Sequence, residues 1–204
     1  MGHARVCLAA WLFAAFLSGS AIGADAEPRL HSGIFEGMML AVDPHGAVTG
    51  YYRQDQGEGV QKRCAFFLAG SVTGGETPIV TWSDRRYPGT LVPWKDGVKL
   101  RIEQGREHGG CGLVLLPQIS SGLILDQIRD AAWHEVRTIA IARAHFHSAP
   151  DVASKKRSFL VAGDVVGVLT DSGDWLEVEY SAKGKMTKGW LRASATRKLV
   201  APSP

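Results

Sequence analysis

The chain has 204 residues, a formal net charge of +3 at pH 7 and a hydrophobic content of 45%. A net charge this small gives no dense basic face of the kind that nucleic-acid binding needs, so we expect no nucleic-acid partner. The length suffices for one large domain or two small ones.

The N-terminus has the pattern of a secretory signal. Arg5 provides a basic start, and residues 7–17 form an apolar run that is too short to span a bilayer. Ala24-Asp25-Ala26 fits the small-x-small rule for signal peptidase, and residues 21–23 are a second candidate. We therefore predict a cleaved signal peptide over residues 1–26 and a periplasmic or secreted product. The alternative is an uncleaved anchor. No later stretch is long and apolar enough to span, so we expect no stable membrane insertion after cleavage.

Two cysteines remain after that signal, Cys64 and Cys111. An even count in an oxidising compartment favours a disulfide. In the chain-entropy model this bond would contribute about 4–5 kcal/mol. The alternative is a catalytic cysteine at Cys111, because His108 is close in sequence. Such a nucleophile usually takes its base from a distant part of the chain, so we favour the disulfide.

Residues 30–118 alternate short apolar runs with turn signals. Asp43-Pro44-His45-Gly46 separates a run over residues 33–42 from another over residues 47–52, which predicts a hairpin. Short strands with turns every 8–12 residues are typical of an antiparallel sandwich or barrel. Further strands are expected over residues 64–70, 79–82, 90–92, 98–102 and 111–116.

The pattern changes between residues 119 and 136. Apolar residues such as Leu123, Ile128 and Trp133 allow an amphipathic helix near its end. We interpret residues 119–136 as a linker or a short helix. Alternation resumes over residues 136–146, which we expect to be the entry strand of a second domain.

The two parts differ in charge. Residues 25–135 hold 11 Lys or Arg against 14 Asp or Glu, whereas residues 136–204 hold 11 against 6. The basic residues of the second part cluster at Lys155-Lys156-Arg157 and at Lys183, Lys185 and Lys188. They are either solvated loop surface or a contact for an anionic partner, such as cell wall or an acidic protein.

Three motifs characterise the second part: Gly163-Asp164 before a Val-rich run, Gly173-Asp174-Trp175 in a turn, and Gly189-Trp190-Leu191. Together they make residues 137–200 resemble the bacterial SH3-like domain. The resemblance implies a small barrel of five or six strands that recognises peptidoglycan or peptides and does no chemistry. The first domain resembles no family that we can name. We therefore expect an all-β protein: an antiparallel sandwich or barrel followed by a small SH3-like barrel.

The aromatic residues of the second part suggest a binding face. We expect Trp190 to fill the core and Trp175 to be half-exposed after its turn. The ends of strands and the edges of turns form the groove of such a barrel, and nearby lysines would attract an anionic partner. The predicted ligand-binding residues are Phe146, His147, Trp175, Lys155, Lys156 and Lys188.

Enzyme signatures are lacking from the sequence. It contains no Gly-x-Ser-x-Gly elbow, no His-Glu-x-x-His and no phosphate loop. His145 and His147 could share one face of a strand and bind zinc if a carboxylate joined them, but none stands at ligand spacing. We expect no catalytic residue, no metal and no cofactor.

These observations lead to one main hypothesis and two alternatives. The first is a secreted, non-catalytic envelope protein that binds a peptidoglycan fragment or another envelope protein. The second is a periplasmic inhibitor or immunity protein that binds a cell-wall-acting enzyme or a toxin. A wall-modifying enzyme ranks last. The sequence assigns no oligomeric state.

Overall fold

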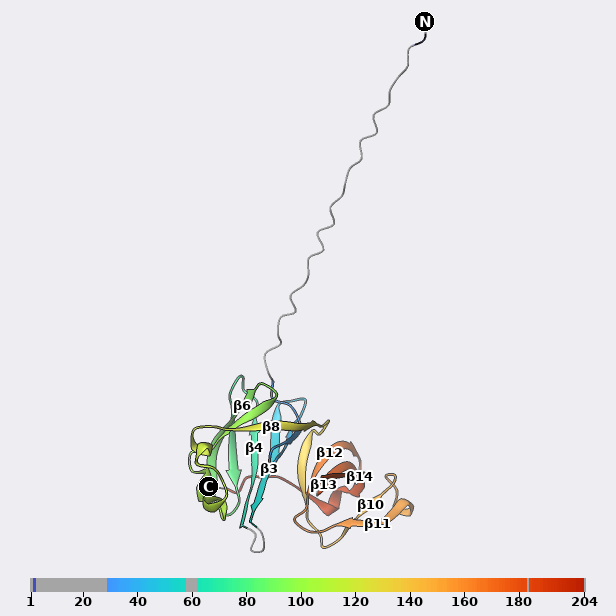
Figure 1. The fold of residues 1–204 in the computed structure, drawn as a ribbon. Helices are drawn as coiled ribbons and strands as arrows, with labels where there is room; N and C mark the ends of the chain where they lie inside the picture. Colours follow the sequence, from blue (N-terminus) through green and yellow to red (C-terminus); the bar gives the residue numbers. More distant parts are fainter. Residues whose placement is uncertain (1, 3–28, 58–61, 183, 204) are drawn as a thin grey trace.

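The computed structural model describes residue 2 and residues 29–57, 62–182 and 184–203. Apart from residue 2, the predicted signal peptide lies outside these residues. The described chain is almost entirely β-structure, arranged as a closed eight-stranded barrel and a curled seven-stranded sheet (Figure 1). This confirms the all-β prediction, and the first unit is a barrel. No helix within the described ranges is long and apolar enough to cross a membrane.

The barrel is an antiparallel meander in which each strand pairs with the next and β8 closes on β1. Closure satisfies the backbone groups of both outer strands, so the barrel has no open edge. Its strands are β1 (Gly33–Phe35), β2 (Met38–Val42), β3 (Ala47–Gln56), β4 (Lys62–Ser71), β5 (Thr77–Trp82), β6 (Arg86–Trp94), β7 (Gly97–Arg101) and β8 (Leu123–Asp130).

The predicted hairpin between β2 and β3 is confirmed. The Asp43 carboxylate accepts hydrogen bonds from the backbone N–H groups of His45 (2.8 Å) and Ala47 (2.7 Å). Gly46 has a φ of +84°, which a glycine adopts at no steric cost. Alternate residues of β3 and β4 then point into the barrel, where Tyr52 and Phe66 stack in the core.

The chain between β7 and β8 contributes to the barrel core. It forms three 3-10 turns, η1 (Gly105–Glu107), η2 (Cys111–Leu113) and η3 (Pro117–Ser120), and we call residues 102–120 the plug. The plug buries Leu115 and Ile119 among the barrel side chains. The strand expected over residues 111–116 is therefore wrong. The left-handed Gly110 (φ +80°) and the following Pro117 interrupt an extended chain on either side of η2.

The interpretation of residues 119–136 as a linker or short helix is also wrong, because residues 123–130 form β8. Leu125 faces the core, while Ile124 and Ile128 face outward, which is the period of a strand. The spacing of the apolar residues is compatible with the period of a helix and with that of a strand. Pairing with both β7 and β1 decides for a strand, because only a strand closes the barrel.

The second unit is an antiparallel sheet in the order β11-β10-β14-β13-β12-β9-β15. The predicted turn at Gly173-Asp174 joins two of its strands, and Gly173 has a φ of +59°. The elements are β9 (Glu135–Ile139), β10 (Ala144–His147), η4 (Val152–Ser154), β11 (Lys155–Leu160), β12 (Val165–Ser172), β13 (Trp175–Ala182), β14 (Lys185–Arg192), η5 (Ala193–Ala195) and β15 (Thr196–Lys198).

Aliphatic side chains of β12, β13 and β14 form the core of this sheet, together with Phe146. Gly189 allows β14 to lie close to β10, because a Cβ there would lie 3.1 Å from the carbonyl oxygen of His147. Trp190, expected in the core, is only half-buried. Trp133, by contrast, is fully buried, at 1% exposure.

Trp133 joins the two units. Its indole lies on Gly167, where a Cβ would come within 2.2 Å of the ring, and its Nε1–H donates to Glu179 (3.0 Å). The Ser32 hydroxyl of the barrel donates to the Trp133 carbonyl (2.6 Å), and Arg129 of β8 pairs with Glu179 (2.7 Å). The two units therefore share a small apolar cluster and a polar contact that only the tertiary structure creates.

The C-terminal segment returns to the barrel after β15. Leu199 packs against the cluster around Trp133, and Arg86 of β6 donates to the carbonyl of Pro202 (2.8 Å). Figure 1 shows the C-terminus beside the barrel rather than beside the second sheet.

Candidate functional site

The second unit carries a pocket where two neighbouring strands separate. β10 pairs with β11 over most of its length, whereas its register with β14 is the single pair His147↔Trp190 in the described chain. Past that pair the strands diverge and leave a pocket of about 270 Å³. We call it the β10 pocket; its lining residues are Ile141, Arg143, Ala144, His145, His147, Val152, Lys155, Arg192 and Ala195.

The β10 pocket is basic. Arg143, Lys155 and Arg192 line it, and none of its lining residues is acidic. The Arg143 guanidinium lies 5.0 Å from the centre of the exposed Phe159 ring. Arg192 lies 4.2 Å over the Trp175 ring, which holds its planar fork in one orientation. Its closest carboxylate, on the solvent-exposed Asp174, is 3.7 Å away.

The two histidines of the pocket are fixed by backbone carbonyls. The ring Nδ1–H of His147 donates to the Asp151 carbonyl (2.8 Å), and that of His145 donates to the Lys156 carbonyl (3.2 Å). A carbonyl only accepts, so Nδ1 carries the proton in both rings and Nε2 is the acceptor of each neutral ring.

These two rings do not make a metal site. No group of three His, Cys, Asp or Glu side chains in the described part of the chain could hold a metal ion. The three cationic side chains of the β10 pocket also oppose a cation by charge repulsion. The pocket is suited to an anion.

The six predicted ligand-binding residues fall into three groups: two line the β10 pocket, two are buried and two lie apart from the lining. His147 and Lys155 line the β10 pocket. Trp175 is 7% exposed and lies behind the pocket, edge-on to His147 (4.6 Å between ring centres), so the expectation that it is half-exposed is wrong. Phe146 is 2% exposed and packs in the core, so its assignment to a binding face is also wrong. Strand alternation explains this: His147 and Phe146 point to opposite sides of β10.

The other two predicted lysines lie apart from the lining. Lys156 is exposed on β11 and contributes its carbonyl to His145. Lys188 pairs with Glu177 (3.1 Å) across β13 and β14. The structure instead brings Arg143 and Arg192 to the pocket. The sequence contained no signal that would join these two residues.

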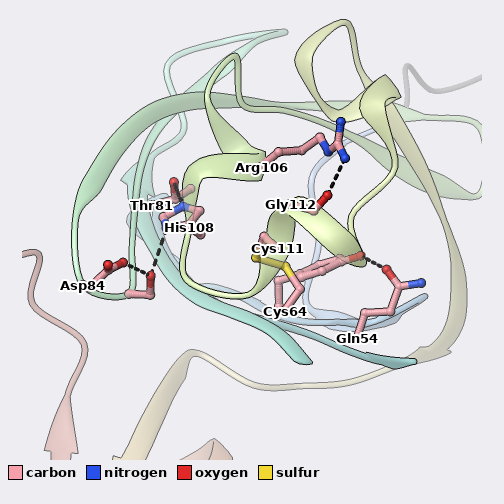
Figure 2. Close-up of a disulfide and its surroundings, with 10 residues drawn as sticks. Gln54, Cys64, Thr81, Asp84, Arg106, His108, Cys111 and Gly112 are labelled. Atoms are coloured by element: carbon pink, nitrogen blue, oxygen red, sulfur yellow. Dashed lines mark hydrogen bonds between the residues drawn. A yellow bond between two sulfur atoms is a disulfide. The ribbon is translucent and has the colours of Figure 1, made fainter. Parts of the chain in front are cut away.

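A second polar cluster lies inside the barrel, next to the disulfide (Figure 2). His108 of the plug is buried, stacked on Phe66 (4.7 Å) and edge-on to Tyr87 (4.8 Å). Its Nε2 lies 3.0 Å from the Thr81 hydroxyl and its Nδ1 lies 3.2 Å from the Ser83 hydroxyl. Burial lowers the pKa of His108 from 6.5 to about 4, so the ring is neutral at pH 7.

This cluster lacks the geometry of a hydrolase. Ser83 approaches His108, but its hydroxyl also lies 2.7 Å from the Asp84 carboxylate, and Asp84 makes no bond to the imidazole. In a catalytic triad the carboxylate orients the histidine rather than the serine. The low pKa of His108 also makes it a weak base near neutral pH. We interpret the cluster as a polar contact that holds the plug against β5.

The predicted disulfide between Cys64 and Cys111 is confirmed. It ties η2 of the plug to β4, with a Cα–Cα distance of 4.3 Å and a sequence separation of 47. A bonded Cys111 has no thiolate, which removes the nucleophile of the alternative Cys/His reading.

In comparisons with known proteins, no family model, no curated protein and no solved structure matches this chain.

Proposed function

We propose that this protein is a secreted, non-catalytic binding protein of the bacterial envelope, and that its second unit is an SH3-like recognition module for a peptidoglycan fragment or an envelope protein. The observation that carries the proposal is the β10 pocket. Concave sites with a few convergent polar groups are the usual places for ligands. Here three cations and two histidines converge, and all five lie in residues 137–200, the part of the chain that resembles the SH3-like domain.

Two further observations support this location and role. The signal-peptide pattern and the Cys64–Cys111 disulfide both agree with an oxidising compartment. Neither the β10 pocket nor the His108 cluster contains an arrangement of nucleophile, base and orienting carboxylate, which agrees with a binding role.

The alternative, an inhibitor of a periplasmic enzyme or toxin, has its own supporting observation. Leu113 is 70% exposed, although it lies two residues after the disulfide-bonded Cys111. Leu116 of the same segment is also exposed. An apolar side chain on a braced turn can enter a partner's cleft with little loss of conformational entropy. In this alternative the barrel, rather than the second unit, makes the contact.

One experiment compares the two proposals. Purified full-length mature protein is sedimented with peptidoglycan sacculi and, in parallel, used as bait in periplasmic extract. Arg143→Gln tests the β10 pocket, Leu113→Asp tests the plug, and Lys198→Gln on the far edge strand β15 is the matched charge control. We expect Arg143→Gln to weaken retention. Loss of retention with Leu113→Asp alone would favour the inhibitor, and no retention by either material would reject the main proposal.

A further inference from the structure

We infer that the β10 pocket binds the free terminal carboxylate of a peptide whose last side chain is small and apolar. The inference rests on the proposed function in that both assign recognition to the same pocket. It goes further because it names the chemical group that is recognised.

Charge indicates a carboxylate or another oxyanion. Guanidinium groups bind carboxylates through two parallel hydrogen bonds, and the pocket offers two of them, Arg143 and Arg192, together with the Lys155 ammonium. Two carboxylates are near but do not line the pocket. Asp174 lies 3.7 Å from Arg192, and the Asp151 side chain accepts a hydrogen bond from the Ala153 N–H at the start of η4.

The remaining lining favours a peptide end over a bare oxyanion. Ile141 and Val152, both exposed, add apolar surface to the lining. A phosphate or sulfate ion would leave that apolar surface without a partner. The last residue of a peptide instead places an apolar side chain next to a carboxylate. A volume of about 270 Å³ is below the usual range for drug-sized ligands, which agrees with one small terminal residue.

The pocket is also held in place before binding. Trp175 supports Arg192 on one side and His147 on the other (4.2 and 4.6 Å). The Asp151 carbonyl fixes the ring of His147 and leaves Nε2 as the acceptor, which complements the amide N–H that precedes a terminal carboxylate. Groups that are already oriented lose little conformational entropy on binding.

The test uses calorimetry and amide NMR on the full mature chain with three probes: N-acetyl-Ala-Ala, its C-terminal amide, and inorganic phosphate. We expect the acid to bind. The amide should bind about tenfold more weakly or not at all, because it loses one charged hydrogen-bond pair. Phosphate should bind more weakly than the acid, because it leaves the apolar part of the lining without a partner. Shift changes should centre on β10, η4 and η5.

Three variants sharpen the result. Arg143→Gln should weaken binding of the acid by about tenfold, and Arg192→Lys, which keeps the charge but loses the fork, should also weaken it. Lys198→Gln on β15 should leave it within about twofold, because only screened long-range attraction is changed. A dispersed NMR spectrum of each variant shows that its fold is kept.

Equal binding of acid and amide, tighter binding of phosphate, or no binding of the acid would each overturn the inference. The sacculus and extract assays separate this failure from failure of the proposed function. Retention that depends on Arg143 without selectivity for the acid rejects the carboxylate and keeps the proposed function. Selective binding of the acid without retention on either material does the reverse.

Discussion

The two β units differ in how they treat the edges of their sheets. The barrel closes β8 on β1 and fills its interior with its own side chains and the plug. The second sheet stays open and ends in β11 and β15. Exposed edge strands invite unwanted pairing, and charged residues such as those at Lys155-Lys156-Arg157 on β11 protect them. The candidate site lies next to the open edge, because Lys155 of the edge strand β11 lines the β10 pocket.

The largest effect is expected at Trp133, where the barrel and the second sheet are in contact. Trp133→Ala should lower the free energy of unfolding by about 3–5 kcal/mol, because it empties the site over Gly167 and leaves Glu179 without one donor. Chemical denaturation measures the loss. Trp94→Ala, at an exposed tryptophan of the barrel, is the control and should cost much less. Equal losses of unfolding free energy for both variants would show that Trp133 does not stabilise the contact between the two units.

Removing the disulfide tests whether it stabilises the barrel alone or both units. Replacing both Cys64 and Cys111 by serine should lower the free energy of unfolding by about 2–5 kcal/mol, since the unfolded chain regains the freedom that the bond removes. The loss should appear in NMR signals and hydrogen exchange of the barrel before those of β12–β14. Uniform loss across both units would mean that they unfold as one.

His108 gives the barrel a pH dependence. The unfolded chain binds a proton at His108 near pH 6.5, but the folded chain does so only near pH 4. Between these values the unfolded state holds more protons, so stability should fall as the pH drops from about 7 to 4, by about 3 kcal/mol in total. The contribution of neutral, buried His108 to the free energy of unfolding is fully present above about pH 7.

The measurement is the difference in unfolding free energy between wild type and His108→Gln across that pH range. The variant should lose this part of the slope, whereas His45→Gln at the exposed hairpin turn should keep it. Parallel pH profiles for wild type and His108→Gln would contradict the burial of the His108 ring.

The smallest effect is expected at Lys188. It is more than half exposed and pairs with Glu177 on the sheet surface, a kind of ion pair that contributes about 0–1 kcal/mol. Lys188→Gln should therefore change stability little and should leave binding at the β10 pocket unaffected. Binding of N-acetyl-Ala-Ala measures this. A loss as large as that of Arg143→Gln would restore Lys188 to the site.

Local patterns were sufficient for several features. The Asp43–Gly46 turn depends on one carboxylate and one glycine within four residues, so it is readable from the chain. The disulfide followed from two cysteines in a chain with a signal pattern. Of the predicted ligand-binding residues, His147 and Lys155 line the β10 pocket, whereas Phe146 and Trp175 are more buried than a place on a binding face requires.

The sequence by itself determined the all-β fold class, because apolar alternation and turn residues act over a few neighbouring residues. It could not determine the role of residues 123–130, since their apolar spacing fits two periods and only pairing with β1 and β7 selects the strand. Nor could it show that Trp133 lies over Gly167. The tertiary structure alone decided the β10 pocket, because the neighbouring position of β10 and β14 in the sheet brings Arg143 and Arg192 together across a long stretch of chain.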